Sequence, residues 1–319
     1  MFEQFKGGQS NPTYRVTAGD RRYALRRKPP GKLLPSAHAV DREYRVTRAL
    51  HGVGFPVARP WVLCEDDSVI GTAFYVMDCV EGRVLWDQAL PGMSREERSA
   101  IWDELNRVIA WLHGVDYRAV GLEDFGKPGA YIARQVSRWS KQYRSSELEK
   151  IDEMDRLIEW LPANIPAGDE TSIVHGDYRL DNTIFHPSEP RILAVLDWEL
   201  STLGHPLADF AYHCMSWHIA PGKFRGIAGL DHAALGIPSE REYVERYCRR
   251  TGRQGIDPST WDYYMAYNLF RIAAITQGIA KRVVDGTAAS EYAREAGSRT
   301  RPLAELGWAQ VERILKRAA

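Results

Sequence analysis

The chain changes character near Gly82, and this change limits the folds open to it. Before Gly82, short β-branched and aromatic runs predict strands; after it, apolar residues recur at helical spacing over long stretches. Strands gathered in one part of a chain and helices in another are typical of an α+β fold. We therefore expect a bilobal protein, with a small strand-rich lobe at residues 1–80 and a larger helical lobe at residues 81–319.

The strand-rich part begins with a predicted hairpin. Thr13–Thr17 and Arg22–Arg27 flank a segment whose Gly19 and Asp20 suit a tight turn. A further strand is predicted at Ala73–Met77. Between them we expect one amphipathic helix from about residue 36, because four apolar or half-apolar residues recur at helical spacing: Val40, Tyr44, Thr47 and Leu50.

The helical part carries three apolar stripes, which we interpret as buried core. The first stripe follows Ser94–Glu97, a capping-box pattern that starts helices. The stripes consist of Ile101, Trp102, Leu105, Val108, Ile109 and Leu112; then Leu148, Ile151, Met154 and Ile158; then Trp261, Met265, Leu269, Ile272, Ile275 and Ile279.

Charge and cysteine usage exclude several classes of protein. The 42 basic residues balance 42 acidic ones, so a protein that binds nucleic acid mainly by neutralising phosphates is not expected. No run approaches the ~20 apolar residues needed to cross a bilayer, and the first residues lack a secretory pattern. The four cysteines have no metal-binding spacing. We therefore expect a cytoplasmic protein with reduced thiols and with neither nucleic acid nor membrane as partner.

The segment His175–Asn182 carries the strongest chemical signal. It lies between predicted short strands, and a further apolar strand, Ile192–Leu196, ends directly at Asp197. Asp177 and Asn182 are five residues apart, as in the kinase loop H-x-D-x-x-x-x-N. Phosphoryl transfer needs positioning and cations rather than covalent help from the protein. We expect Asp177 to orient an acceptor hydroxyl and take its proton, and Asn182 and Asp197 to hold Mg²⁺. The alternative is an Asx-rich turn that only caps backbone donors.

These residues resemble the signature of the aminoglycoside phosphotransferase and choline kinase superfamily, whose fold is protein-kinase-like. Within it, the chain is similar to the kinase-like domain of acyl-CoA dehydrogenase family members ten and eleven. The resemblance covers roughly residues 5–285 and rests further on Gly7–Tyr14, Leu25–Leu34, Ala39–Tyr44, Asp197–Glu199 and Gly204–Asp209. It implies a small ATP-binding lobe, a larger catalytic and substrate-binding lobe, and ATP and Mg²⁺ as cofactors.

The ATP-binding residues are expected mainly in the first lobe. A glycine-rich loop before the first strand could offer backbone amides to phosphates, and it lacks a Walker pattern: Gly7, Gly8, Gln9, Ser10 and Asn11. The resemblance puts the phosphate-anchoring cation at Arg26, with Lys28 on the same strand face in reserve, where most kinases have lysine. Glu43 is expected to pair with this cation.

The lobe connection is expected near Met77–Gly82. The resemblance implies that Met77, Asp78 and Val80 line the adenine site, with the backbone of Asp78 and Val80 at the adenine edge. It also implies that His175 packs and orients the loop rather than acting as the base, and that Asp209 braces the loop as a buried carboxylate.

The sequence indicates the phosphate acceptor less precisely than it indicates phosphoryl transfer. The resemblance implies a small-molecule hydroxyl, notably a 4-hydroxy acid or its CoA thioester; the alternative is an aminoglycoside or other amino alcohol. The region Ser216–Ser239 has few acids, which suits an anionic acyl group, although it could equally be a surface loop. Its notable residues are Trp217, His218, Lys223, Phe224 and Arg225.

Two other functional classes are weighed against a kinase. A nucleotide-binding pseudokinase or scaffold is favoured only by arginine at position 26, since Asp177, Asn182 and Asp197 are all present. No sequence motif supports a hydrolase, because neither a G-x-S-x-G elbow nor an H-E-x-x-H helix occurs. Since the relatives are sometimes fused to a dehydrogenase, we also expect a functional link to a separate acyl-CoA dehydrogenase.

Overall fold

The computed structural model of the chain describes residues 2–5, 11–29, 38–222, 225–287 and 292–319. The chain forms two compact units, which are described separately. The first contains Met1–Gly126, Ser172–Leu203 and Ala233–Pro238; the second contains Lys127–Thr171, Gly204–His232 and Ser239–Ala319. The lobe boundary expected between residues 80 and 81 stays a prediction.

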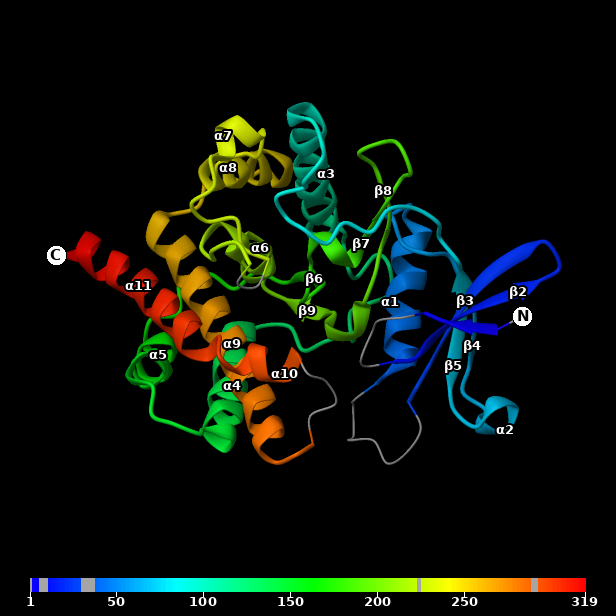
Figure 1. Ribbon diagram of the computed structural model, residues 1–319, viewed down its shortest axis with the longest axis horizontal. Coiled ribbons are helices and arrows are strands. Elements are labelled where there is room, and N and C mark those ends of the chain that lie inside the picture. Colours follow the sequence, from blue (N-terminus) through cyan, green and yellow to red (C-terminus); the bar gives the residue numbers. More distant parts are fainter. Residues whose placement is uncertain (1, 6–10, 30–37, 223–224, 288–291) are drawn as a thin grey trace. The chain divides into compact units, whose positions relative to one another are not determined.

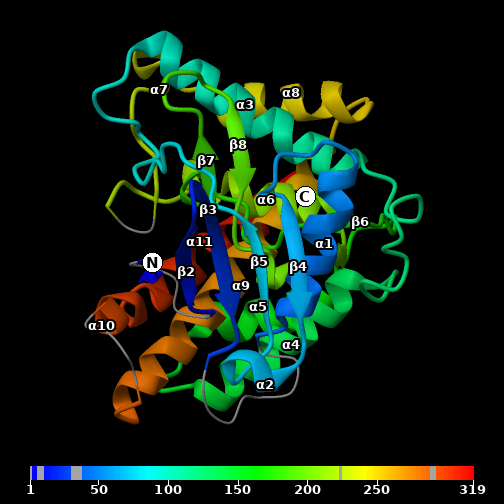
Figure 2. The same ribbon diagram turned by 90° about the vertical axis from the view of Figure 1, so that its right-hand side faces the viewer.

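A five-stranded antiparallel sheet forms one part of the first unit (Figures 1 and 2). Its order is β1-β2-β3-β5-β4, with β1 at Phe2–Gln4, β2 at Thr13–Ala18, β3 at Arg21–Arg27, β4 at Pro60–Cys64 and β5 at Phe74–Asp78. The predicted hairpin is confirmed, since Thr13 faces Arg26 and Gly19 occupies the left-handed turn at φ 59°. β1 and β4 were not predicted: β1 is three exposed residues, and β4 starts with a proline and is largely open to solvent.

Helix α1 (Val40–Gly52) packs against β4 and β5 and completes the core of this sheet. Val40, Thr47 and Leu50 are buried, as the helical spacing predicted, whereas Tyr44 is only partly buried. Val46, which that spacing did not include, is also fully buried. Val40 packs with Ala73 and Tyr75 beneath the sheet. A short helix, α2 (Asp67–Ile70), joins β4 to β5.

The rest of the first unit is built on helix α3 (Arg95–Gly114), which starts with the predicted capping box at Ser94 and Glu97. Helix α3 contacts β6 and β8, two of the three short strands predicted around the motif. These strands are β6 (Ser172–Val174), β7 (Thr183–Phe185) and β8 (Ile192–Val195); β9 (Thr202–Gly204) pairs with β6. Short 3-10 turns occupy Leu180–Asn182 and Trp198–Leu200.

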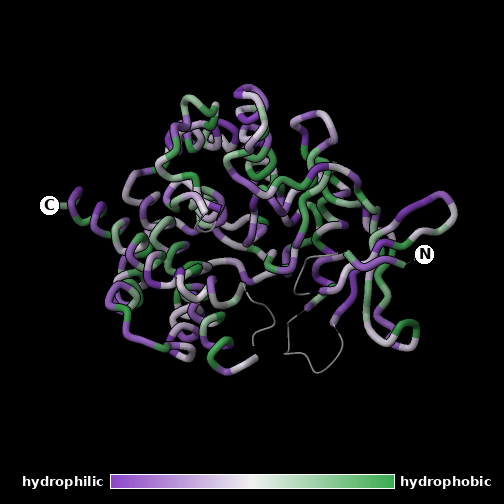
Figure 3. Tube along the Cα trace, in the orientation of Figure 1, coloured by the Kyte–Doolittle hydropathy of each residue, from purple (hydrophilic) through white to green (hydrophobic). Residues whose placement is uncertain are grey.

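The second unit is helical and centres on α9 (Pro258–Val284), which contacts α4, α5, α6, α10 and α11. The other helices of this unit are α4 Tyr131–Ser146, α5 Asp152–Ala163, α6 Pro206–Cys214, α8 Glu240–Thr251, α10 Tyr292–Gly297 and α11 Thr300–Ala318, with a short 3-10 turn at Met215–Trp217. The short helix α7 (His232–Leu235) starts at the last residue of a second-unit segment, and its other residues belong to the first unit. Gly307 of α11 lies close to its neighbours, since a Cβ there would lie 3.2 Å from Leu157 of α5 and 3.4 Å from Leu269 of α9. The end of α11 beyond Val311 is mainly exposed and alternates hydrophilic with hydrophobic residues (Figure 3).

The apolar stripes of α3 and α9 form core, but the second stripe was partly wrong. Leu148 lies before α5 and is 43% exposed, because the helix begins only after Ile151. Met154 is buried, as predicted, together with Leu157 and Leu161. Across the described ranges, no helix has the length and apolar content needed to cross a membrane.

Candidate active site

The hairpin β7–β8 brings Asn182 and Asp197 to the same end of two strands. Asn182 directly precedes β7, and Asp197 follows β8 after one residue. Thr183 faces Val195 in the antiparallel register, and the backbone N–H of Leu196 donates to the carbonyl of Asn182 at 2.8 Å. Fifteen residues of sequence therefore separate two side chains that the strand pairing places at one edge.

The loop before β7 holds Asp177 beside Asn182. The Asn182 side-chain Nδ2 donates to the backbone oxygen of Asp177 at 2.9 Å and to its carboxylate Oδ2 at 3.0 Å. His175 is fully buried and bridges the loop to β8. Its Nε2 lies 2.8 Å from the carbonyl of Leu196, and its Nδ1 accepts the N–H of Asp177 at 3.1 Å. This pattern corresponds to a neutral imidazole with its proton on Nε2, engaged in holding the loop.

Contacts with helix α3 and with Leu200 also fix the loop. The hydroxyl of the fully buried Tyr178 donates to the carbonyl of Leu105 in α3 at 3.0 Å. Gly176 has φ 83°, and a Cβ there would lie 2.9 Å from the carbonyl oxygen of Leu200. Only glycine fits this turn without displacing backbone. Asp177 is thus presented by a loop that is fixed at several points.

Asp197 adopts a left-handed conformation at φ 63° and ψ 63°, which is unusual for a residue with a side chain. Its carboxylate Oδ1 accepts from Nη2 of Arg26 at 3.0 Å. The side chain of Asp197 is 37% exposed, so it remains accessible while it is paired. Strained backbone of this kind occurs frequently at functional sites.

Arg26 also joins a buried cluster around Glu43. Its Nε lies 2.7 Å from Oε2 of Glu43, a residue only 2% exposed. Asn11, which is 1% exposed, donates from Nδ2 to Oε1 of Glu43 at 2.6 Å, and the Tyr75 hydroxyl donates to Oε2 at 3.3 Å. Strand β3 and helix α1 are therefore linked by an ion pair whose carboxylate also accepts hydrogen bonds from Asn11 and Tyr75.

Burial is the largest single effect and opposes the charge on Arg26, but the combined effects of Glu43, Tyr75 and Asp197 outweigh it. The pKa of Arg26 is therefore raised above its usual range, and the guanidinium stays charged. Burial raises the pKa of the Tyr75 hydroxyl, and the neighbouring Glu43 adds to this effect. The tyrosine therefore remains a neutral donor.

The structure does not bring every expected residue to this cluster. Lys28 follows the end of β3, and within the described parts of the chain it has no ion pair, whereas Arg26 has carboxylate partners. Gly7, Gly8, Gln9 and Ser10 lie outside the described residues, so Asn11 alone of the expected glycine-rich loop is seen.

The segment expected at the adenine edge leaves β5 and runs alongside β7. The N–H of Asp78 is used within the sheet, donating to the carbonyl of Arg59 at 2.9 Å. Met77 lies in β5, and the backbone of Val80 makes no hydrogen bond to the described residues. At Gly82 a Cβ would lie 2.2 Å from the carbonyl oxygen of Phe185, so glycine is needed for this close approach.

Sequence reasoning missed two charged residues inside the motif. Arg179 extends Nη2 to within 3.1 Å of Oδ2 of Asp177, and its Nε lies 3.5 Å from Oδ1 of Asp181. The side chain of Asp181 is 3% exposed. A buried carboxylate needs a cation, so the pattern Arg-x-Asp within the motif was the available signal.

The donor set at the end of the hairpin suits Mg²⁺. The carboxylate of Asp197 and the Asn182 oxygen Oδ1 are hard oxygen ligands, and the hydrogen bonds of Asn182 use its nitrogen instead. In the described residues, no group of three or more His, Cys, Asp or Glu side chains could hold a metal. Mg²⁺ at sites of this kind is generally bound by one or two protein ligands together with phosphates and water.

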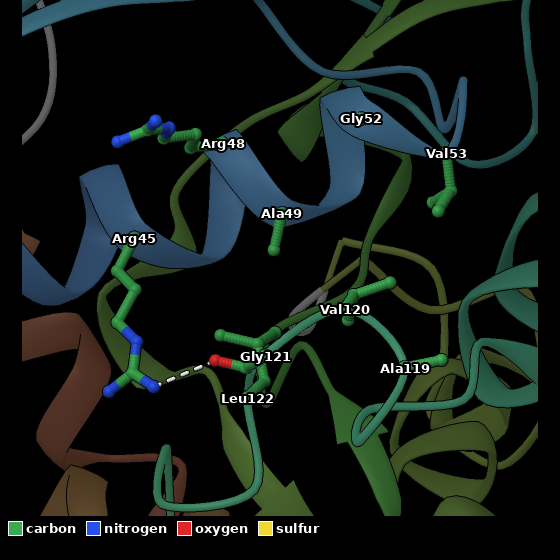
Figure 4. A pocket seen from close by; sticks show the side chains of 9 residues that line it. All are labelled: Arg45, Arg48, Ala49, Gly52, Val53, Ala119, Val120, Gly121 and Leu122. Atoms are coloured by element: carbon green, nitrogen blue, oxygen red, sulfur yellow. Dashed lines mark hydrogen bonds between the residues drawn. The ribbon is translucent and has the colours of Figure 1, made fainter.

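A separate hollow of about 420 Å³ lies on the outer face of α1 (Figure 4). Arg45 lines it and donates to the carbonyl of Gly121 at 2.8 Å. The other lining residues include Arg48, Ala49 and Val120. None of the expected site residues lines this hollow, since Glu43 lies on the opposite face of the helix at 3.6 residues per turn.

The region expected to shape an acceptor cleft is partly core of the second unit. Trp217 is 8% exposed and packs its ring 4.9 Å from that of Tyr243. His218 pairs with Glu240 at 2.7 Å, with its side chain 8% exposed. Lys223 and Phe224 lie outside the described residues. Asp209 is a buried residue in the first turn of α6.

A strand-rich sheet with a strand-to-helix Arg–Glu pair, followed by the Asp177–Asn182 loop and Asp197, defines a kinase-like phosphotransferase. The chain belongs to the phosphotransferase enzyme family, whose profile matches residues 2–264. The resemblance inferred from the sequence is therefore confirmed. This family comprises phosphotransferase enzymes, the class of enzyme predicted from the sequence.

Known proteins similar to the chain support both family and fold. It is 49% identical over 308 residues to acyl-CoA dehydrogenase family member 10 of Mus musculus, covering 96% of the chain but only 28% of that relative. A candidate aminoglycoside phosphotransferase from Ralstonia eutropha is 61% identical, with a TM-score of 0.91 over 98% of the chain and 92% of the other. An aminoglycoside phosphotransferase solved with AMP-PNP and hygromycin B shares the fold, at 16% identity and a TM-score of 0.62, covering 98% and 93% of the two chains. The predicted α+β, protein-kinase-like fold is confirmed.

Proposed function

We propose that the chain transfers the γ-phosphate of MgATP to a hydroxyl group of a small molecule, a 4-hydroxy acid or its CoA thioester. The observation that carries the chemistry is the hydrogen bond from Asn182 Nδ2 to Asp177 Oδ2 at 3.0 Å. This bond fixes the orientation of the carboxylate that we assign to the acceptor hydroxyl. An oriented carboxylate and a metal-binding amide within one loop are what phosphoryl transfer requires.

Each residue of the cluster has a proposed role. Asp177 orients the acceptor hydroxyl and takes its proton late, as the acceptor oxygen bonds to phosphorus. Arg26, held by Glu43 at 2.7 Å, anchors the α- and β-phosphates in the place where most kinases use lysine. Lys28 is a second cation near the end of the same strand. The expected glycine-rich loop and the backbone near Asp78 and Val80 complete the nucleotide site.

Asn182 and Asp197 would hold the metal ion. When bound, Mg²⁺ neutralises the charge that develops on the phosphate oxygens. The carboxylate of Asp197 also pairs with Arg26 at 3.0 Å, and its side chain is 37% exposed. The ATP requirement is supported further by the fold shared with an enzyme solved with AMP-PNP.

The acyl acceptor is favoured by the relatives and by local charge. Two relatives carry the name acyl-CoA dehydrogenase family member, at 49% and 45% identity. The chain spans 28% to 40% of their length, so a link to a separate or attached dehydrogenase is part of this proposal. Between Ser216 and Ser239 the only acid is Asp231, against the cations Lys223 and Arg225. Such a segment suits an anionic acyl group better than a cationic drug.

An amino sugar is the second candidate acceptor. It is favoured by the name of the 61% identical structure, which is a candidate aminoglycoside phosphotransferase. An aminoglycoside is polycationic, so its binding would require acidic side chains around the acceptor position. A pseudokinase that binds nucleotide without transfer is the remaining alternative.

Mass spectrometry of phosphorylated products would test these alternatives. The panel contains 3- and 4-hydroxy acids, free and as CoA thioesters, together with aminoglycosides, choline and homoserine. Each is incubated with MgATP and enzyme, and the Asp177→Ala variant serves as the blank. We expect product from the hydroxyacyl compounds alone. Product from an amino sugar would replace the acceptor, whereas nucleotide binding without any product would favour the pseudokinase.

A further inference from the structure

Helix α4 and the residues just before it carry basic side chains and no acidic one. From residue 125 to residue 146 the sequence contains no Asp or Glu. The same stretch contains five basic residues: Lys127, Arg134, Arg138, Lys141 and Arg144. In a chain whose 42 basic and 42 acidic residues balance, this segment gathers positive charge on one element. A surface with charge of one sign attracts ligands of the opposite sign.

Three of these cations share one side of α4. Arg134, Arg138 and Lys141 follow one another at intervals of four and three residues, which places them on the same side of the helix. The other side is buried, with Ile132 and Val136 only 4% and 2% exposed, and α4 packs against α9 and α5 (Figure 1). We call the side with the three cations the α4 basic face.

The α4 basic face surrounds a hollow of about 630 Å³. Its other lining residues are Ala133 and Ser137, whose small side chains leave room between the cations. The lining includes neither a carboxylate nor a large apolar side chain. The hollow therefore suits an anionic group rather than an apolar one.

Within the parts of the chain that the structure describes, the cations of the α4 basic face form no ion pair. Arg144, at the end of the same helix, differs in this respect, since it pairs with Glu147 at 3.2 Å and with Asp155 at 2.6 Å. Arg134 donates to two backbone carbonyls, those of Gly129 and Lys127, which fix its guanidinium without neutralising it. The positive charge of this face is therefore available to a ligand.

The size of the α4 basic face favours a small polyphosphate. The seven-residue step from Arg134 to Lys141 corresponds to about 10 Å of helix. Guanidinium groups bind phosphate oxygens in a bidentate way, and an ammonium binds them as a point charge. A peripheral membrane surface would need large apolar side chains beside the cations, and the hollow has none.

We propose that the α4 basic face binds the 3′-phosphate and the diphosphate of the coenzyme A that carries the acyl acceptor. This binding is non-covalent and raises the affinity for the thioester. A free 4-hydroxy acid has no phosphate and gains nothing from it. The inference rests on the proposed function, and within it selects the CoA thioester as acceptor rather than the free acid.

The test measures the affinity for CoA by calorimetry, in wild type and in the double variant Arg138→Glu/Lys141→Glu. AMP-PNP and Mg²⁺ are present at saturation, so that the adenine nucleotide part of CoA is not measured at the ATP site. We expect the double variant to bind CoA at least about tenfold more weakly, because two attractive contacts become repulsive. Dephospho-CoA, which lacks the 3′-phosphate, should bind the wild type more weakly than CoA. Pantetheine, which has no phosphate, should not distinguish the two proteins.

The matched control is Arg249→Glu/Lys316→Glu, which changes the charge equally at exposed positions of α8 and α11. Exposed charges remote from a ligand contribute little, so CoA affinity should stay within about twofold of wild type. Thermal unfolding of both variants verifies that each is folded. In steady-state kinetics, the KM of Arg138→Glu/Lys141→Glu for a 4-hydroxyacyl-CoA should rise more than its KM for the free acid.

Three results would overturn the inference: unchanged CoA affinity in Arg138→Glu/Lys141→Glu, an equal loss in the control, or inorganic tripolyphosphate bound as tightly as CoA. The first of these, together with phosphorylation of a hydroxyacyl-CoA by the wild type, would leave the proposed function intact. Conversely, CoA binding that depends on the α4 basic face in a protein that phosphorylates no hydroxy compound would support the site and overturn the proposed function.

Discussion

Asn182 donates from a single nitrogen to both the backbone oxygen and the carboxylate of Asp177, at 2.9 and 3.0 Å. The two bonds determine which way the amide faces, because only its NH₂ group can donate. Its oxygen is consequently directed away from Asp177. One residue thus aligns the proposed base and presents a metal ligand at the same time.

Replacing Asn182 by aspartate separates these two tasks. Asn182→Asp keeps an oxygen ligand but loses the donor and puts a second carboxylate about 3 Å from Asp177. We expect kcat to fall by about 100-fold or more, while the divalent ion still binds. Steady-state kinetics and Mn²⁺ titration measure the two effects. Asn164→Asp, at an exposed amide that donates to Trp160, is the control, and equal loss in both variants would contradict the argument.

Glu43→Gln is expected to destabilise the protein. The change removes the charge that pairs with Arg26 at 2.7 Å and leaves a guanidinium with only 12% of its side chain exposed. Breaking a buried pair typically costs about 3–5 kcal/mol. Asp197 also pairs with Arg26, so we expect the lower end of this range. Urea unfolding measures the loss, with Asp41→Asn on the same helix as the control; equal stability of the two variants would refute the prediction.

Gly82→Ala should be poorly tolerated. Its Cβ would meet the carbonyl oxygen of Phe185 at 2.2 Å and the side chain of Ile184 at 2.6 Å, so backbone has to move. We expect a loss of about 1–3 kcal/mol, as for other overpacked sites. Gly114→Ala has nothing within 4 Å and provides the matched control. Thermal unfolding of both variants checks the prediction, which is refuted if their melting temperatures agree.

Tyr143→Phe is expected to leave stability at neutral pH unchanged or slightly higher. Its side chain is fully buried, and its hydroxyl has no hydrogen-bond partner among the described residues. Tyr263 is the control, because its hydroxyl donates to the carbonyl of Leu161 at 2.9 Å. Removing that donor leaves a buried acceptor unpaired and should cost about 1–3 kcal/mol. Urea unfolding compares the two variants, and a larger loss for Tyr143→Phe would contradict the assignment.

The same residue gives a prediction for alkaline pH. Burial, aided by Glu147 and Asp155, raises the pKa of Tyr143 to about 12. In the unfolded chain this phenol ionises near its ordinary pKa of about 10. Between these values the unfolded state binds fewer protons, so stability falls as pH rises from 10 towards 12. Urea unfolding across this range should show a shallower decline for Tyr143→Phe than for the wild type; parallel curves would exclude the effect.

The sequence predicted the parts of the fold that follow from periodicity and turns. The β2–β3 hairpin, helix α1 and the capping box of α3 all depend on local signals of this kind. Strand β4 escaped prediction because it starts at Pro60 and its exposed Trp61 and Val62 break the alternation expected of a half-buried strand. Its identity is set by pairing with β5, which is not a local property.

Prediction of the site was limited in a similar way. Asp177, Asn182 and Asp197 could be selected by spacing, and Arg26 and Glu43 by resemblance, but their distances depend on how strands and helix pack. Arg179 was missed because the side chain of an arginine in a loop is usually exposed to solvent. The pattern Arg-x-Asp was the available signal, and the burial of Asp181, with 3% of its side chain exposed, shows that this arginine has an interior partner.

The β7–β8 hairpin has a consequence for recognising distant relatives. Asn182 and Asp197 meet because Thr183 faces Val195, whereas the turn at residues 186–191 lies at the opposite end and is largely exposed. Residues added to or removed from that turn would change the interval between asparagine and aspartate without moving either side chain. A search that requires the aspartate fifteen positions after the asparagine would therefore overlook homologues with the same geometry, whereas one that allows a variable hairpin tip would retain them.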